Sequence, residues 1–432
     1  MTNRWIAVIS CLIAAGCYAP PPEPGTTYYS VPQGKTTLVP VATLPNALCV
    51  LQAGENSDGP RLATDAAGHG RFFITPQQGA TGTIVMRCEA GGRTDTQRFV
   101  LGAGVPGTAP PPPPPPVVRA TRPALSTVEA QEISDEELLR RGYPFRPDER
   151  ISPEAYAAWL RAVTRPAQLV EPSQVTNPAL RHDVAKIPIC CGKTLLNWSG
   201  VEVSGPAGPF AYVRGTWKVP GVTGEPNGTD YSSTWVGIDG DGVNDLVQAG
   251  TEQDVTTITF PLELQLATYR AWSQFLPQQP TEQIISGVPL NPGDEVFAEV
   301  FVANAGGSPD LKGAFGVFWL ETPSGVSQIY TPVGGTVVGG GTAEWVVERT
   351  TLCGDAACTP SKSSLGNLAN YTSASMINGM ARKSRAPRRG GYTNCCDLGS
   401  TRISMVNNSG TTLSTPSTPD GTTAAFTWNG FK

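Results

Sequence analysis

Histidine is almost absent from this chain of 432 residues, in which His69 and His182 are the only two. Serine and cysteine hydrolases and most zinc sites use histidine as a base or a ligand, so the low count argues against these chemistries. Charge is also sparse: 16% of the residues are charged and the net charge is −5, which argues against a nucleic-acid binder that neutralises phosphates. By contrast, 48 Gly and 41 Pro interrupt the chain, and they argue against a mostly helical protein.

The N-terminus has the pattern of an export signal. Residues 1–4 are basic, residues 5–16 are apolar, and small residues lead into Cys17, which predicts a cleaved signal peptide rather than a membrane-spanning helix. Residues 12–17, LIAAGC, resemble the lipobox of bacterial lipoproteins. This resemblance implies cleavage before Cys17 and a lipid on its sulfur. We therefore expect a protein anchored to the membrane of the bacterial cell envelope, at the outer membrane or the cell surface.

Eight further cysteines in an exported chain favour disulfides. We expect Cys49 to pair with Cys88, Cys353 with Cys358, and the doublet Cys190-Cys191 with the doublet Cys395-Cys396. Metal binding by the two doublets is the weaker alternative, because neighbouring thiols rarely both reach one tetrahedral ion.

Composition divides the chain into six segments. We expect a signal peptide (1–16), a lipid-linked tether (17–28), a small immunoglobulin-like β-sandwich (29–104), a Pro-rich linker (105–120), a helical segment (121–186) and a large β domain (187–432). In the helical segment, Ser134 with Glu137 and Ser152 before Pro153 mark two helix starts. Two short amphipathic helices need a partner surface, and their place just before the largest domain is typical of a pro-segment.

Residues 187–432 alternate between apolar and polar residues, in short runs that turn signals separate. Expected strands include residues 211–219, 233–238, 256–266, 295–302, 314–321 and 344–349, which predicts an all-β sandwich. Residues 190–381 hold 18 Asp and Glu against seven Lys and Arg, so carboxylates are available for acid-base chemistry. No Asp-Thr-Gly or Asp-Ser-Gly occurs, so the pattern of the paired-aspartate peptidases is missing.

Four clusters in this domain occur in a fixed order: NWSG (197–200), GTWKVP (215–220), STWVGIDG (233–240) followed by LVQAG (246–250), and AEWVVE (343–348). Together they closely resemble the glutamic peptidases, or eqolisins. The resemblance implies a lectin-like (concanavalin-like) sandwich of two antiparallel sheets with a cleft on its concave face. It also implies protein or peptide substrates and no metal or cofactor. We expect the protein to act as a monomer.

Gln248 and Glu344 stand at the positions of that family's catalytic pair. The resemblance implies that the Glu carboxylate takes a proton from water and returns it to the leaving amine, while the neutral Gln amide hydrogen-bonds the oxyanion. Trp235 and Asp239 match residues that line the site. Tyr269 and Trp272 match the segment that faces the substrate.

Several alternatives stay open. Glu348 lies on the same strand face as Glu344 and is the alternative base. Residues 239–245, DGDGVND, have oxygen ligands at spacings that suit calcium, although a turn is the favoured interpretation. Trp198, Trp217 and Trp345 are expected to pack in the sandwich. Gln274 replaces an acidic residue frequent in the family, which affects subsite preference and the pH optimum.

The resulting prediction is an acid-active endopeptidase that is made as a precursor, with residues 121–186 covering the cleft until acid releases them. The rival is a lectin-like protein that binds glycans or peptides on the same face without cutting them.

Overall fold

The structure is a computed structural model, and it describes residues 26–29, 32, 34–53, 59–77, 82–101, 118–187, 194–204, 209–259, 264–304, 309–384, 392–397, 399–418 and 420–431. The predicted signal peptide, the lipidated Cys17, most of the Pro-rich linker and the doublet Cys190-Cys191 lie outside these residues. Within them, no helix combines the length and the apolar character needed to cross a membrane.

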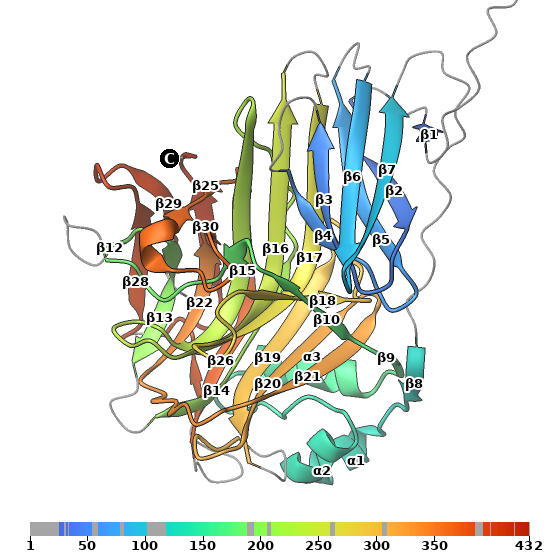
Figure 1. The fold of residues 1–432 in the computed structure, drawn as a ribbon. Helices are drawn as coiled ribbons and strands as arrows, with labels where there is room; N and C mark the ends of the chain where they lie inside the picture. The colour runs from blue at the N-terminus through green and yellow to red at the C-terminus, as the bar shows by residue number, and fades with distance from the viewer. Residues whose placement is uncertain are drawn as a thin grey trace, which may run out of the picture.

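Two β-sheets form the large domain (Figure 1). The first, called the front sheet, is antiparallel and has the strand order β28 (Thr401–Val406), β13 (Trp198–Ser204), β22 (Thr342–Glu348), β15 (Gly228–Asp239), β16 (Leu246–Ile258), β17 (Leu264–Leu276), β18 (Glu282–Ser286) and β10 (Ser173–Asn177). The second, called the back sheet, has the order β29 (Thr412–Pro416), β30 (Ala424–Trp428), β26 (Ser373–Lys383), β14 (Phe210–Lys218), β19 (Glu295–Ala303), β20 (Phe315–Thr322), β21 (Gly325–Pro332), β9 (Ala167–Val170) and β8 (Val118–Arg122).

Short elements complete the large domain. They are β11 (Leu180–Arg181), β23 (Thr351–Leu352) and β24 (Ser364–Leu365), which form a small sheet, together with β12 (Thr194–Leu195), β25 (Asn367–Leu368), β27 (Tyr392–Asn394) and the 3₁₀ turn η1 (Pro360–Lys362).

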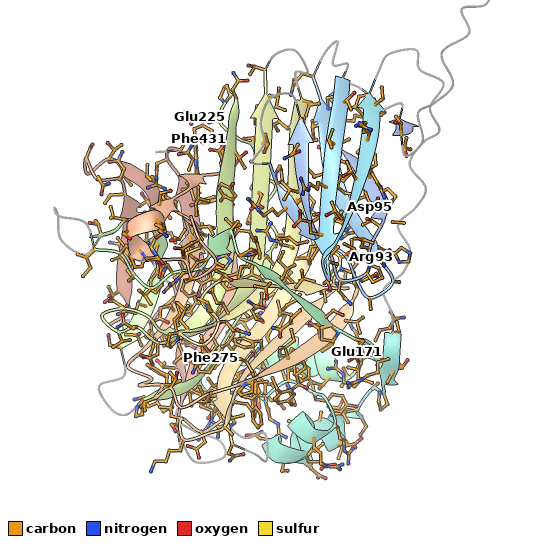
Figure 2. The ribbon with its side chains drawn as sticks, viewed as in Figure 1. Arg93, Asp95, Glu171, Glu225, Phe275 and Phe431 are labelled. Atoms are coloured by element: carbon orange, nitrogen blue, oxygen red, sulfur yellow. A yellow bond between two sulfur atoms is a disulfide. The ribbon has the colours of Figure 1, made fainter. Side chains whose placement is uncertain are left out.

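The main core lies between the two sheets and contains Trp217, Phe275 and Trp345, with Phe275 labelled in Figure 2. Strand alternation selects which residues enter this core, because successive side chains point to opposite faces. On β16, Val247 belongs to the core, whereas Gln248 contacts the chain that crosses the other face. The predicted lectin-like β-sandwich is therefore confirmed, and the opposite face of the front sheet carries the polar residues.

The N-terminal module is a β-structure, as predicted, but it is joined to the large domain. Its sheet has the order β1 (Thr26–Tyr29), β7 (Arg93–Leu101), β6 (Gly82–Ala90), β3 (Leu48–Ala53) and β4 (Arg61–Ala63), while β2 (Thr37–Ala42) pairs with β5 (His69–Pro76). Strand β5 also pairs with β17, and Ile258, Leu264 and Leu266 of the large domain pack in the module's own core. The module and the large domain therefore share both hydrogen bonds and buried apolar surface (Figure 1).

The predicted helical segment contains three helices, α1 (Thr127–Glu132), α2 (Asp135–Arg140) and α3 (Pro153–Val163). The expected caps are present: Glu137 N–H donates to Ser134 Oγ at 3.2 Å, and Ala155 N–H donates to Ser152 Oγ at 3.3 Å. The helices bury a small cluster around Trp159 and dock on the back sheet through Phe145. This is the partner surface that two short amphipathic helices require.

Two predictions about the chain are wrong. Residues 256–266 were expected as one strand, but they contain the end of one strand, β16, and the start of the next, β17, which pairs with it antiparallel. The predicted cross-link between the doublet Cys190-Cys191 and the doublet Cys395-Cys396 is also wrong, because Cys395 bonds to Cys396. Both side chains are buried in the core between the sheets, where the sulfur of each cysteine lies against the sulfur of its neighbour in the chain. The disulfides Cys49–Cys88 and Cys353–Cys358 are confirmed.

Candidate active site

A short stretch of chain crosses the polar face of the front sheet. Residues 180–186, called the strap here, follow β10 and begin with β11, which pairs with β23. His182 is fully buried and Asp183 is 8% exposed, so the front sheet and the strap cover one another. The strap belongs to the segment predicted as a pro-segment.

Gln248 and Glu348 flank one peptide bond of the strap. Gln248 Nε2 donates a hydrogen bond of 2.7 Å to the carbonyl oxygen of His182. The N–H of Asp183 donates a hydrogen bond of 2.9 Å to Glu348 Oε1. The carbonyl and the N–H belong to the same amide, so one side chain holds its oxygen and the other holds its nitrogen.

The backbone groups next to this amide are hydrogen-bonded as well. The N–H of His182 donates to Gln274 Oε1 at 2.9 Å, and Trp198 Nε1 donates to the carbonyl oxygen of Asp183 at 3.0 Å. Gln274, the residue that departs from the family pattern, therefore accepts a hydrogen bond from the strap backbone. Trp217 and Trp345 lie in the core as predicted, whereas Trp198 also contacts the strap.

The His182 side chain lies in a pocket of the front sheet. Its ring stacks on Trp272 with 3.4 Å between ring centroids and 8° between planes. Its Nδ1 lies 3.1 Å from Glu348 Oε2, and its Nε2 lies 3.6 Å from Glu282 Oε1. Burial by itself lowers the pKa of His182, but the two carboxylates outweigh burial and raise it above its ordinary value. The pocket therefore favours an imidazolium.

Glu348 is held in place by Trp235, whose Nε1 donates to Glu348 Oε2 at 2.9 Å. Trp235 stands opposite Gly250 on β16, where an added Cβ would lie 2.3 Å from the carbonyl oxygen of Thr234 and 2.5 Å from Trp235 Cβ. Only glycine fits this position. Burial raises the pKa of Glu348, and the hydrogen bond from His182 opposes the shift.

Glu344 lies elsewhere on the same face. Gly237 pairs with both Gln248 and Glu344, so the two side chains are level across the strand between them. Within the described residues, none of the hydrogen bonds to the strap backbone around His182 and Asp183 involves Glu344. Burial and the nearby Glu202 raise its pKa well above the ordinary value, which favours the neutral acid.

Glu282 connects the pocket to a buried ion network. Arg270 Nε lies 3.0 Å from Glu282 Oε1, and Arg270 Nη1 lies 2.6 Å from Asp254 Oδ2. Burial opposes ionisation of Glu282, but Arg270 and then His182 lower its pKa to about 2. Arg270 Nη1 also donates to the carbonyl oxygen of Arg61, so the N-terminal module contacts this network.

The structure places two of the predicted site residues away from the strap. Tyr269 packs edge-on against Phe73 at 5.1 Å and accepts a hydrogen bond from Val222 N–H, on the core side of β17, so it does not contact the strap. Tyr269 and Trp272 are an odd number of residues apart, and a strand places such residues on opposite faces. Asp239 accepts hydrogen bonds of 2.6 Å from Gly340 and Gly341, which occupy the oxygens that a calcium ion would use.

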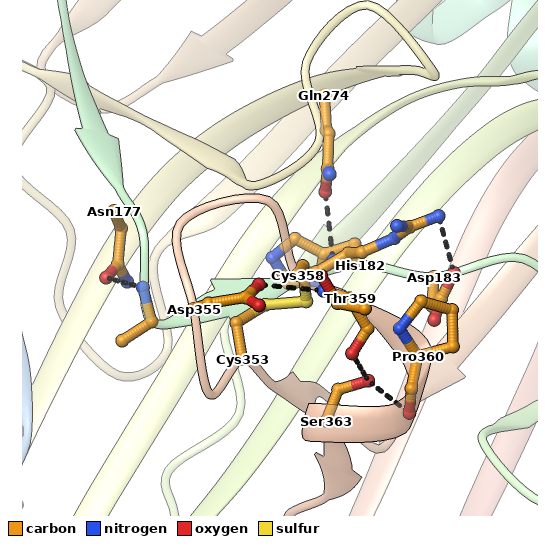
Figure 3. The surroundings of a disulfide bond; sticks show 12 residues. Asn177, His182, Asp183, Gln274, Cys353, Asp355, Cys358, Thr359, Pro360 and Ser363 are labelled. Atoms are coloured by element: carbon orange, nitrogen blue, oxygen red, sulfur yellow. Dashed lines mark hydrogen bonds and ion pairs between the residues drawn. A yellow bond between two sulfur atoms is a disulfide. The ribbon is translucent and has the colours of Figure 1, made fainter.

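The disulfide loop 353–358 borders the strap (Figure 3). Cys353 N–H donates to the carbonyl oxygen of Ala179 at 2.8 Å, just before the strap begins. Figure 3 shows His182 and Asp183 beside this disulfide, with Gln274 reaching His182 from β17.

The profile of the peptidase A4 family matches residues 196–428, more than half of the chain. The chain belongs to this family. Peptidase A4 members are the glutamic peptidases or eqolisins, so this protein is a glutamic peptidase.

Three solved structures are similar in fold to this glutamic peptidase. Scytalido-glutamic peptidase with a transition state analog inhibitor is 19% identical, with a TM-score of 0.42, and the match covers 54% of this chain and 98% of that chain. The same enzyme with a peptide-based transition state analog is 19% identical, with a TM-score of 0.41, and the match covers 54% of this chain and 98% of that chain. SCP-B, an eqolisin in complex with the tripeptide Ala-Ile-His, is 18% identical, with a TM-score of 0.41, and the match covers 54% of this chain and 98% of that chain. No curated protein sequence matches the chain.

Sequence reasoning assigned no role to His182, Glu282 or Arg270. The rarity of histidine was the one available signal, because one of only two such residues stands 15 positions before Asn197, where the first family cluster begins.

Proposed function

We propose that this glutamic peptidase hydrolyses peptide bonds in proteins with Gln248 and Glu348 as its catalytic pair. The observation that supports the proposal is their position on the two sides of one amide, at 2.7 Å from its oxygen and 2.9 Å from its nitrogen. Glu348 removes a proton from water as the water attacks the carbonyl carbon, and returns it to the leaving nitrogen. Gln248 is neutral at any working pH and donates to the oxygen as negative charge develops there.

Glu348 replaces Glu344 as the proposed base. Glu348 hydrogen-bonds the amide nitrogen that must receive a proton, and Trp235 orients it. Glu344 does not contact this amide in the described residues, and burial beside Glu202 raises its pKa well above the ordinary value, which favours the protonated form.

We further propose activity in mild acid. A group that first accepts and then donates a proton works best where both of its forms are populated, and burial moves the pKa of Glu348 above 4.5. Acid also weakens the strap, because protonation of Glu348 removes one of the two carboxylates that pair with His182. The helical segment with its strap thus acts as a pro-segment that closes the cleft at neutral pH.

The proposed location follows from the N-terminal pattern alone. The lipobox-like LIAAGC run supports a lipid on Cys17 and attachment to the bacterial cell envelope. Labelling cells with an alkyne fatty acid would modify the wild type and leave the Cys17→Ser variant unmodified. Labelling of both proteins would exclude lipidation at this cysteine.

The activity is tested by digesting an unfolded protein between pH 2 and 7 after acid incubation of the purified chain. We expect pepstatin-resistant cleavage that Glu348→Gln reduces at least about 100-fold. The matched control is Glu344→Gln, a change of the same kind on the same strand, and it should retain activity within about tenfold. Loss in Glu344→Gln together with activity in Glu348→Gln would exchange the two roles.

A further inference from the structure

We propose that the precursor hydrolyses its own chain between His182 and Asp183, as an intramolecular reaction. This inference rests on the proposed function, because it requires Gln248 and Glu348 to be the catalytic pair. It adds the identity of the cleaved bond, the residue on each side of it, and the first-order, intramolecular kinetics of the reaction.

The strap presents this amide as a bound substrate would. Gln248 hydrogen-bonds its oxygen and Glu348 hydrogen-bonds its nitrogen, whereas Gln274 and Trp198 hold the next N–H before it and the next carbonyl after it. Four side chains, one from each of β13, β16, β17 and β22, thus hold the N–H and the carbonyl group of two consecutive residues. Such positioning converts a bimolecular reaction into a unimolecular one, which lowers the barrier considerably.

Contacts on both sides of the bond fix its register. Before the bond, β11 pairs with β23, and the His182 ring is stacked on Trp272. After the bond, Ala185 N–H donates to the carbonyl oxygen of Gly240 at 2.9 Å, and Lys186 N–H donates to Asn197 Oδ1 at 2.8 Å. A slip of one residue would remove the imidazole from its pocket and break these hydrogen bonds together.

The reaction balances with water as the only co-reactant. The water oxygen bonds to the carbonyl carbon of His182 while Glu348 takes one water proton and Gln248 stabilises the oxyanion. The bond between this carbon and the nitrogen of Asp183 then breaks. The proton held by Glu348 passes to that nitrogen, which already lies 2.9 Å from Glu348 Oε1. The products are a carboxyl group on His182 and a new amino terminus at Asp183.

Cleavage at this bond cuts the chain without cutting a cross-link. Cys49–Cys88 lies before the bond, whereas Cys353–Cys358 and Cys395–Cys396 lie after it, so none of the disulfides in the described ranges connects the two sides. Strand pairs such as β5 with β17 and β10 with β18 would hold the two pieces together until conditions separate them.

The test follows the full-length precursor after a step from neutral to acid pH, by intact mass and N-terminal sequencing. We expect a first new N-terminus at Asp183, with a half-time that does not change over a tenfold range of protein concentration. Glu348→Gln and, independently, Gln248→Ala should slow the cut at least about 100-fold, and Glu344→Gln should not. Circular dichroism of each variant at neutral pH confirms its fold.

The unfolded test protein separates this inference from the proposed function. A precursor that digests that protein but stays intact, or that is first cut at another bond, overturns self-cleavage at His182–Asp183 and leaves the peptidase in place. A half-time inversely proportional to concentration overturns the intramolecular reaction. A wild type that cuts neither itself nor the test protein overturns both proposals.

Discussion

Glu299 links the stability of the precursor to pH. This carboxyl group is fully buried in the back sheet, under the docked helical segment. Tyr212 donates a hydrogen bond of 2.5 Å to Glu299 Oε1, and Phe145 N–H from the helical segment donates one of 3.3 Å to Oε2. Burial raises the pKa of Glu299 to about 7, and Arg214 at 3.6 Å only partly opposes the shift.

The sign of the effect follows from proton binding. In the unfolded chain this carboxyl ionises near pH 4.5, whereas in the folded protein it keeps its proton up to about pH 7. The folded state therefore binds more protons in this window, and its stability falls as the pH rises. A raised pKa from 4.5 to about 7 corresponds to about 3 kcal/mol of unfolding free energy lost across the window.

The change to make is Glu299→Gln, in a Glu348→Gln background that prevents self-cleavage. Gln resembles the neutral acid in shape, but its amide nitrogen cannot accept the hydrogen bond from Phe145, so a loss of about 1 kcal/mol is expected at pH 4.5. At pH 7.5 the Gln variant should be the more stable protein, because no buried charge forms at this position.

Urea unfolding from pH 4.5 to 7.5 measures the effect, with Glu348→Gln alone as the reference. The variant's unfolding free energy should fall less across this range, by about 3 kcal/mol. Equal slopes in the two proteins would refute the raised pKa of Glu299 and, with it, the argument from burial.

The remaining predictions concern the cleft. Substrates with His before the cut bond should be cleaved faster than those with Ala. Glu282→Gln should reduce that preference about tenfold in kcat/KM, measured with a series of peptides. An unchanged preference would show that the charge of Glu282 does not contribute to recognition of His. Trp198→Phe removes one hydrogen bond to the chain beyond the cut, so kcat/KM for a long peptide should fall about fivefold, and an unaltered value would contradict that contact. Self-cleavage should be fastest near the pKa of Glu348, above 4.5, and slower both at pH 2 and at neutral pH, because Glu348 must be ionised to accept the proton and protonated to return it; a rate that is highest at pH 2 would contradict Glu348 as the base.

Much of the fold could be predicted from local pattern. Strands such as β14, β19 and β20 lie within one or two residues of the predicted runs. The error at residues 256–266 arose because an alternating pattern that continues across the end of one strand and the start of the next does not show where the first strand ends. The motif did not predict that Tyr269 and Trp272 lie on opposite faces of β17, because a motif gives positions in sequence and not the face of the strand on which each side chain lies.

The choice between Glu344 and Glu348 shows the limit of such reasoning for the site. In register, Gly237 aligns Gln248 with Glu344, whereas Glu348 pairs with Ser233 further along β15. A bound chain that runs obliquely across the strands brings Gln248 and Glu348 to the same amide. The direction in which the bound chain crosses the strands cannot be predicted from the spacing or the alternation of these residues.

The sequence by itself determined the all-β sandwich and the ordered glutamic peptidase clusters, because strand alternation and short motifs are local properties of a chain. Only the tertiary structure decided that a strap from upstream of the family clusters crosses the polar face of the front sheet, that its imidazole contacts Glu348 and Glu282, and that Gln248 and Glu348 hydrogen-bond the same peptide bond. These contacts join residues between about 60 and 170 positions apart, and their geometry depends on how two sheets and a crossing segment pack.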